Sequence, residues 1–290
     1  MNDRIVRANG VDLCVETFGA PTDPAILLIM GSSGSMDWWE DEFCERLAGG
    51  SRFVIRYDHR DTGGSISYEP GAPRYTGPDL AEDAVGVLDS LGVARAHVVG
   101  LSMGGALAQV VALDHPERVA SLTLIATAPA GPGPDDPDLP GMSEATQSRF
   151  AEVAEPDWSD RAAVIDYLVH LARVSAGRSR PFDEAGMRAL WERVLDRTAN
   201  IEASMKNHAA LEGGERSRER LRDVDAPTLV VHGTEDPVLP YGNGVALARE
   251  IPGAELLALE QTGHEVPRTV WGVLVPAILE HTSSGRDGPS

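Results

Sequence analysis

The sequence predicts an α/β protein with a mostly parallel central sheet, flanked by helices and carrying a helical insertion. Short, continuously apolar runs alternate with segments of helical periodicity, and such runs are typical of strands buried on both faces. The runs occupy residues 25–30, 53–57, 96–99, 122–126, 227–233 and 256–259. Between about 143 and 222 only helical patterns occur. With 290 residues, 42% of them hydrophobic, the chain can bury one sizeable core, so no second domain is required.

The elements before the insertion can be justified in order. Residues 4–18 alternate between polar and apolar around Asn9-Gly10, which predicts a hairpin of two antiparallel edge strands. A helix is expected from Glu40 to Leu47, between two of the buried strands. The sequence Thr76-Gly77-Pro78-Asp79 is typical of a capping box. It should begin a helix whose apolar residues keep helical spacing, namely Leu80, Ala84, Val87, Leu88 and Leu91.

A charged loop follows the strand 53–57, with the sequence Asp58-His59-Arg60-Asp61-Thr62-Gly63-Gly64-Ser65. Such a loop could form a charged site, but turns rich in Asp and Arg more often satisfy their own charges. We therefore expect the charges of residues 58–65 to pair with one another.

The insertion begins where residues 130–137, rich in Gly and Pro, cannot form a regular element. We expect a helical cap over 131–221, inserted into a core made of 1–130 and 222–282. The clearest helix in the cap carries an apolar stripe at Met187, Leu190, Trp191, Val194 and Leu195.

After the insertion the alternation of strands and helices resumes. Helices are expected at 242–250 and 266–281, each following a buried strand. The tail 283–290, rich in Ser, Gly and Pro, is expected to be disordered.

The composition excludes several classes of function. The net charge of −20, from 25 basic and 45 acidic residues, would repel nucleic acid and anionic membranes. The sequence has no apolar leader and no run of about 18 apolar residues, so we expect a cytoplasmic protein without a membrane span. Cys14 and Cys44 fit neither a metal site nor a disulfide framework, and the single lysine, Lys206, excludes a P-loop. We expect no metal, no cofactor, a small-molecule partner, and a monomer or small homo-oligomer.

The segment Gly100-Leu101-Ser102-Met103-Gly104 lies between a buried strand and a helix-like run, which is the context of a nucleophile elbow. Its two glycines remove the Cβ atoms that would keep the strand and the helix apart. Ser102 would then project its hydroxyl above the sheet edge. The N–H of Met103 would lie at the helix N-terminus, where a developing negative charge is favoured. The alternative interpretation is a glycine-rich turn with a capping serine.

The loop Gly31-Ser32-Ser33-Gly34, directly after the strand 25–30, is the second chemical candidate. Glycine-rich turns after a strand also occur in dinucleotide sites. Here the third glycine of that pattern is missing and no helix opens directly behind the loop, which argues against a dinucleotide.

A serine hydroxyl becomes an effective nucleophile only when a base takes its proton and an acid orients that base. Asp236 and His264 each follow one of the late buried strands, so the chain order is Ser, Asp, His, as expected for an elbow on an α/β sheet. The other histidines are less well placed. Glu235 and Glu265 are alternatives to their neighbours, although adjacent residues in an extended loop tend to face opposite ways.

Together these motifs resemble the α/β-hydrolase superfamily over about residues 20–130 and 222–282. Within it the chain is similar to the small bacterial serine esterases that include aclacinomycin methylesterase. The similarity is carried by residues 55–63, 96–104, 112–115 and the loops of Asp236 and His264.

The resemblance implies a role for each candidate residue. Ser102 would be the nucleophile, Asp236 the orienting acid and His264 the general base, and the N–H groups of Ser32 and Met103 would form the oxyanion hole. The chain departs from the family pattern at Met30-Gly31, where many members have His-Gly, and at Ser32-Ser33. The insertion has little similarity that can be aligned, so the family's substrate does not transfer with the triad.

We therefore expect a serine hydrolase that cleaves carboxylic esters of small apolar or aromatic substrates through an acyl-enzyme. A methyl ester of a polyketide-like compound is one such substrate. Lactone opening, carbon–carbon bond hydrolysis and perhydrolysis use the same triad and are alternatives. The alternative from another class is a non-catalytic ligand-binding protein with this fold, and the intact triad argues against it.

Overall fold

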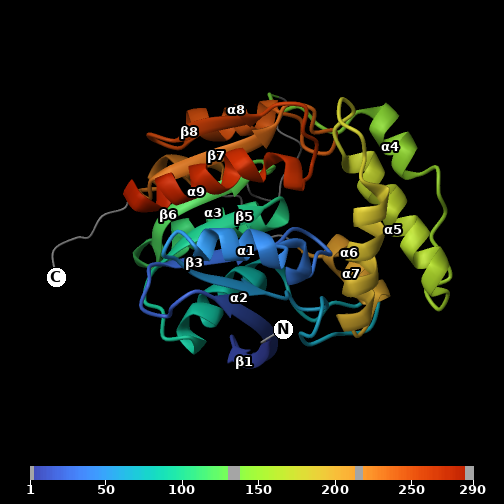
Figure 1. The fold of residues 1–290 in the computed structure, drawn as a ribbon, viewed down its shortest axis with the longest axis horizontal. Coiled ribbons are helices and arrows are strands. Elements are labelled where there is room, and N and C mark those ends of the chain that lie inside the picture. Colours follow the sequence, from blue (N-terminus) through green and yellow to red (C-terminus); the bar gives the residue numbers. More distant parts are fainter. Residues whose placement is uncertain (1–2, 130–137, 213–217, 285–290) are drawn as a thin grey trace.

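The computed structural model describes residues 3–129, 138–212 and 218–284. Within these residues an eight-stranded sheet forms the centre of the molecule, in the order β1-β2-β4-β3-β5-β6-β7-β8 (Figure 1). Its strands are β1 (Arg4–Ala8), β2 (Val11–Phe18), β3 (Ala25–Ile29), β4 (Phe53–Tyr57), β5 (Ala96–Leu101), β6 (Val119–Ile125), β7 (Thr228–Gly233) and β8 (Glu255–Leu259). β2 pairs antiparallel with both β1 and β4, and all other pairs are parallel. The predicted α/β class with a mostly parallel sheet is confirmed.

The N-terminal hairpin forms where the sequence predicts it. Asn9 and Gly10 both have positive φ, 43° and 75°, as a two-residue turn of type I′ requires. The turn brings Ala8 opposite Val11 and sets the register of the whole pair. The hairpin therefore supplies one edge of the sheet, far from the strands that carry the chemical candidates.

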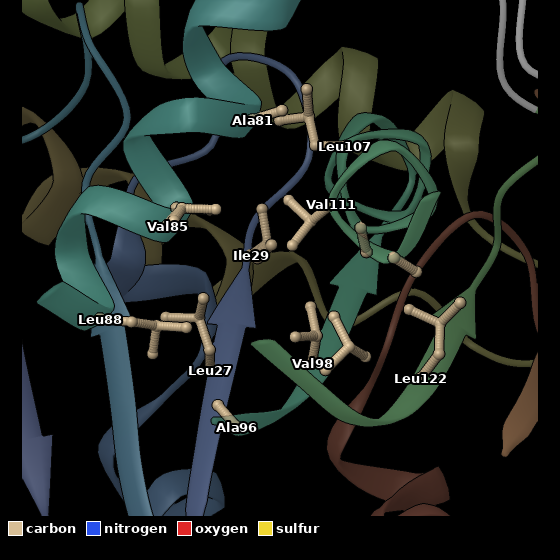
Figure 2. Packing of buried hydrophobic residues seen from close by; sticks show 14 of the residues in the cluster. Leu27, Ile29, Ala81, Val85, Leu88, Ala96, Val98, Leu107, Val111 and Leu122 are labelled. Atoms are coloured by element: carbon tan, nitrogen blue, oxygen red, sulfur yellow. The ribbon is translucent and has the colours of Figure 1, made fainter. Parts of the chain in front are cut away.

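Helices cover both faces of the sheet. The helices α1 (Asp41–Ala48) and α9 (Trp271–Ser284) pack on one face, and α2 (Gly77–Ser90), α3 (Met103–Asp114) and α8 (Gly242–Glu250) pack on the other. The side chains of alternate residues in a strand point to opposite faces of the sheet. Leu27 and Ile29 contact the α2 and α3 side (Figure 2), whereas Ile26 and Leu28 belong to the α1 and α9 side. Burial on both faces is why the central strands read as continuous apolar runs.

A separate group of helices lies at one end of the sheet, on the right in Figure 1. These helices are α4 (Glu144–Phe150), α5 (Arg161–Ser175), α6 (Glu184–Arg197) and α7 (Ile201–Ala209). The predicted apolar stripe lies on α6, and its residues Leu190, Trp191 and Val194 are buried in one cluster with residues of α5. Within the described residues no helix is long and apolar enough to cross a membrane. The division into a core and a cap over 131–221 stays a prediction, because 130–137 and 213–217 lie outside the described residues.

The C-terminal helix differs from the prediction at both ends. It was expected to begin at Val266, but α9 begins at Trp271, after a short 3₁₀ turn over Arg268–Val270. Pro267 explains the delay, since the residue before a proline is disfavoured in the helical region. At the other end α9 includes Ser283, whose Oγ donates to the carbonyl of Leu279 at 2.7 Å, so the disordered tail does not begin at 283 as predicted. Residues 285–290 lie outside the described part of the chain.

Two buried histidines should make the fold sensitive to acid. Burial lowers the pKa of His97 to about 4 and that of His59 to about 3. In the unfolded chain a histidine protonates near pH 6.5, so below that pH the unfolded state binds more protons and stability falls as the pH falls. We expect His97→Gln to lose less stability than the parent protein between pH 7.5 and 5.0, by on the order of 1–2 kcal/mol in urea unfolding.

His115→Gln is the matched control, because His115 lies at the surface beside Glu82. It removes a histidine in the same way at a site that is not buried, so it separates the loss of a histidine from the burial that acts on His97. An equal loss in His97→Gln and His115→Gln would contradict the assignment of the acid sensitivity to His97.

Candidate active site

The turn after β5 holds Ser102 in a strained backbone conformation. Ser102 has φ 54° and ψ −120°, a region that L-residues avoid and that costs roughly 1–3 kcal/mol. Neighbouring segments fix it in place, since the N–H of Ser102 donates to the carbonyl of Ile125 at 2.9 Å and the hydroxyl of Thr127 donates to the carbonyl of Ser102 at 2.8 Å. The turn therefore has the geometry that the glycine pattern predicts for a nucleophile elbow.

The flanking glycines allow this turn because no side chain would fit. A Cβ atom on Gly100 would lie 2.2 Å from the carbonyl oxygen of Gly104, and one on Gly104 would lie 2.2 Å from the carbonyl oxygen of Ile29. The first contact joins the strand to the helix that follows it. The second brings the start of α3 against the end of β3, which leads into the Gly31–Gly34 loop.

Three predicted residues meet at the ends of three parallel strands. The Ser102 Oγ lies 2.8 Å from Nε2 of His264, and Nδ1 of His264 lies 2.8 Å from Oδ2 of Asp236. An ionised carboxylate can only accept, so Nδ1 carries the proton and Nε2 is left to accept from the serine hydroxyl. The His264 side chain is 14% exposed and that of Asp236 is fully buried. The arrangement is a continuous hydrogen-bonded chain from a buried acid to a partly accessible hydroxyl.

The surroundings of Asp236 keep it ionised. Burial alone would raise its pKa, but contacts with His232 and His264 outweigh burial and bring the pKa to about 2. Its second oxygen, Oδ1, accepts from the N–H groups of Val238 and Leu239, both at 2.9 Å. These bonds also fix the direction in which the carboxylate faces His264.

The Gly31–Gly34 loop lies beside the serine. A Cβ atom on Gly31 would be 3.2 Å from Cβ of Ser102 and 3.8 Å from its Oγ, so Ser32 follows a residue in direct contact with the elbow. Met103 is the first residue of α3, where an N–H has no carbonyl one turn earlier to bond to. Both predicted oxyanion donors thus belong to segments that touch the Ser102 turn.

Glu235 and Glu265, the alternatives to Asp236 and His264, bind backbone N–H groups of the segment that follows α5. Glu235 accepts from the N–H groups of Arg178 and Ser179, at 2.7 and 2.9 Å. Glu265 accepts from the N–H of Gly177 at 3.1 Å. Both carboxylates therefore hold the segment that follows α5, and attach the loops of Asp236 and His264 to the inserted helices.

The charged loop 58–65 does not satisfy its own charges, so that prediction was wrong. Its charged side chains are buried and pair with residues of other elements. The pairs are Asp58 with Arg197 of α6, Arg60 with Asp83 of α2, and Asp61 with Tyr75 and with Asn207 of α7. Burial is the physical reason, because a buried charge requires a partner in fixed geometry and a short loop cannot supply one for each.

His208 contacts the candidate site, and the sequence analysis did not predict this. The N–H of Ser33 donates to Nδ1 of His208 at 2.8 Å, and Nε2 of His208 lies 2.9 Å from the carbonyl oxygen of Arg60. Ser33 and His208 are 175 positions apart, and a bond from backbone to side chain leaves no periodic pattern. No motif or spacing in the sequence could have indicated it.

A cavity of about 610 Å³ lies next to the acid loop. It is lined by residues of 140–146, by Arg178 and by the loop 234–242. Asp236 contributes to its wall, but Ser102 and His264 do not. We therefore assign no substrate to this cavity.

The fold and this site define the class of the protein. Residues 24–267 match the family described as the alpha/beta hydrolase fold, and the chain belongs to that family. It is 32% identical to rhodomycin D methylesterase DauP of Streptomyces sp. (strain C5) and 33% identical to rhodomycin D methylesterase DnrP of Streptomyces peucetius. Each alignment covers 97% of this chain and 98% of the relative. The resemblance stated from the motifs is confirmed.

A solved structure shares the fold at lower sequence identity. The meta-cleavage product hydrolase from Pseudomonas fluorescens IP01 superposes with a TM-score of 0.74 at 20% identity, and the match covers 98% of each chain. At this identity the similarity concerns the architecture alone.

We predict that Gly104→Ala is destabilised by about 3 kcal/mol or more in urea unfolding. The new Cβ would meet the carbonyl oxygens of Ile29 and Met30 at 2.2 and 2.5 Å, and these backbone atoms cannot move without disturbing β3. Gly272→Ala is the matched control, since Gly272 also lies near the start of a helix but has open space around it. That variant should be as stable as the parent protein or up to about 1 kcal/mol more stable. Equal stability of the two variants would refute the steric argument.

Proposed function

We propose that the protein is a serine hydrolase that cleaves carboxylic esters through an acyl-enzyme. The observation that carries the proposal is the hydrogen-bonded chain from Asp236 through His264 to Ser102, with the serine on a strained turn. A serine held in this way beside an oriented imidazole is the arrangement from which acyl transfer proceeds on this fold.

The first half of the proposed reaction forms the acyl-enzyme. Ser102 Oγ attacks the ester carbonyl carbon while Nε2 of His264 takes the hydroxyl proton. The N–H groups of Ser32 and Met103 donate to the oxyanion, and Asp236 stabilises the imidazolium. His264 then gives its proton to the leaving alcohol.

The second half releases the acid. A water molecule attacks the acyl carbon while His264 takes its proton, and the same proton returns to Ser102 Oγ when the carbon–oxygen bond breaks. The products are one carboxylic acid and one alcohol. Every proton transfer passes through Nε2 of His264, so no metal or organic cofactor is needed.

We propose a methyl ester of an apolar or aromatic compound as the substrate class. The named activity of the two Streptomyces relatives supports it, since both align with almost the whole chain. Lactone opening and carbon–carbon bond hydrolysis need the same triad, but no contact among the residues that the structure describes favours either over ester cleavage.

We also propose that residues 131–221 act as a cap on the active site and that the protein works in the cytoplasm. The contacts of Glu235 and Glu265 with residues 177–179 support the cap. Two unpaired, buried thiols, Cys14 and Cys44, suit a reducing compartment.

The triad is tested by three substitutions. Ser102→Ala and His264→Ala should each lower kcat for p-nitrophenyl acetate by about 10⁶-fold, because either change removes the nucleophile or its base. Asp236→Asn should lower kcat by about 10⁴-fold, because the base is retained but no longer correctly oriented. Release of p-nitrophenolate measures each rate.

Glu235→Gln is the matched control, since Glu235 precedes Asp236 but binds the segment after α5. It should keep kcat within about ten-fold of the parent protein. Turnover that persists in Ser102→Ala would reject the serine mechanism.

We predict that a neutral aromatic methyl ester has a higher kcat/KM than its analogue with a second, remote carboxylate. The net charge of −20 repels anions, and three arginines of the proposed cap that could offset this repulsion are already paired with carboxylates. These pairs are Arg173 with Glu184, Arg188 with Asp166, and Arg193 with Glu40. The difference between the two substrates should shrink when salt is raised from 0.05 to about 0.5 M. Preference for the carboxylate analogue at both salt concentrations would reject the methyl ester class.

A further inference from the structure

The Gly31–Gly34 loop is a tight turn with a defined peptide orientation. The N–H of Gly34 donates to the carbonyl of Gly31 at 3.2 Å, which closes a β-turn with Ser32 and Ser33 at its centre. Ser33 has φ 62°, whereas Ser32 is not among the described residues with positive φ. This combination matches the φ pattern of a type II turn, which differs from type I by a flip of its central peptide, here the bond between Ser32 and Ser33.

A type II turn favours glycine at the position that Ser33 occupies. A serine there is disfavoured, because its Cβ crowds the backbone when φ is positive. The flipped peptide thus needs an additional interaction to hold it. Relaxation to type I would exchange the directions of the Ser32 carbonyl and the Ser33 N–H.

His208 supplies that interaction from the inserted helix α7. Its Nδ1 accepts the Ser33 N–H at 2.8 Å, so Nδ1 carries the lone pair and Nε2 carries the proton. Nε2 then donates to the carbonyl of Arg60 at 2.9 Å. Burial lowers the pKa of His208, which keeps the ring neutral and Nδ1 free to accept. In a type I turn the Ser32 carbonyl would face this lone pair and repel it.

The helix that carries His208 is itself fixed to the core. Nδ2 of Asn207 donates to Oδ2 of Asp61 at 2.8 Å, and the hydroxyl of Ser204 donates to the carbonyl of the same residue. On the other side of the loop, Nε2 of His59 lies 2.9 Å from the carbonyl oxygen of Met30. The rings of His59 and His208 contact each other edge to face, with centroids 5.9 Å apart. The turn is thus held on both sides by buried groups.

We propose that His208 is a positioning residue for the oxyanion hole. It holds the Ser32–Ser33 peptide and thereby fixes the position of the turn, whose preceding peptide, Gly31–Ser32, carries the Ser32 N–H beside Ser102. This inference rests on the proposed ester hydrolysis, in which Ser32 is an oxyanion donor.

Two substitutions distinguish the two hydrogen bonds that the imidazole of His208 makes, one with Ser33 and one with Arg60. His208→Asn places an amide oxygen where Nδ1 lies and so retains an acceptor for Ser33 but loses the donor to Arg60. His208→Gln places an amide N–H where Nε2 lies and retains the donor but loses the acceptor. If the role of His208 were merely structural, the two variants would have similar kcat values. If His208 positions the loop, only His208→Gln should have a low kcat.

We expect kcat for p-nitrophenyl acetate to fall about 10- to 100-fold in His208→Gln, and to stay within about three-fold of the parent protein in His208→Asn. KM should be unchanged in both variants, since the hydrogen bond from the Ser32 N–H to the oxyanion forms only in the transition state. The inhibition constant of an aryl trifluoromethyl ketone, which forms an oxyanion on serine, should rise in His208→Gln by the same factor as kcat falls. Equal kcat values in the two variants would overturn the proposal.

A second variant tests the same idea through the turn. Ser33→Gly should restore kcat in His208→Gln to within about ten-fold of the parent protein, because glycine supports a type II turn without an added acceptor. If His208→Gln alone does not fold, the double variant is measured in its place. A double variant that folds but has a kcat as low as that expected for His208→Gln overturns the proposal. Loss of turnover in Ser102→Ala, measured alongside, distinguishes failure of this inference from failure of the serine mechanism.

Discussion

The close approach of backbones around Ser102 is the constraint on which the rest of the site depends. The turn needs φ 54° at Ser102, and this conformation is held only because Gly100 and Gly104 let β5, α3 and β3 come closer than side chains would allow. The same contact sets the position of the Gly31–Gly34 loop, since Gly104 packs on the carbonyls of Ile29 and Met30. One packing event in the centre of the sheet thus places both the serine and the loop that faces it.

The inserted helices are tied to each of the three loops that meet at the serine. His208 binds the loop of Ser32, Glu235 beside Asp236 binds the segment after α5, and the N–H of His264 donates to the carbonyl of Ser175 at 2.8 Å. Two of these three ties use main-chain groups of the insertion. Main-chain contacts fix the position of a segment without fixing its residue types, so these two ties place few demands on the sequence of the insertion.

The sequence predicts those residues of the site that belong to short motifs or directly follow a predicted strand. Ser102 is identified by its glycines, and Asp236 and His264 by their places after strands, because parallel strands bring their carboxyl ends to one edge. His208 and two partners of the charged loop, Arg197 and Asn207, were missed, since their bonds join segments 139 or more positions apart. Such bonds depend on how the insertion docks, and neither periodicity nor local spacing contains that information.

The strongest periodic signal in the insertion proves to concern packing. Leu190, Trp191 and Val194 of the apolar stripe are buried against α5, and Trp191 contacts Trp38 edge to face with ring centroids 5.2 Å apart. Trp38 follows the Gly31–Gly34 loop, so this stripe docks the insertion onto the core. These three residues of the stripe are buried and have little surface left for a ligand. Hydrophobic periodicity in the insertion therefore marks mainly packing, whereas residues that contact a substrate leave no comparable pattern. This is why a sequence can identify the chemistry of this site more readily than its substrate.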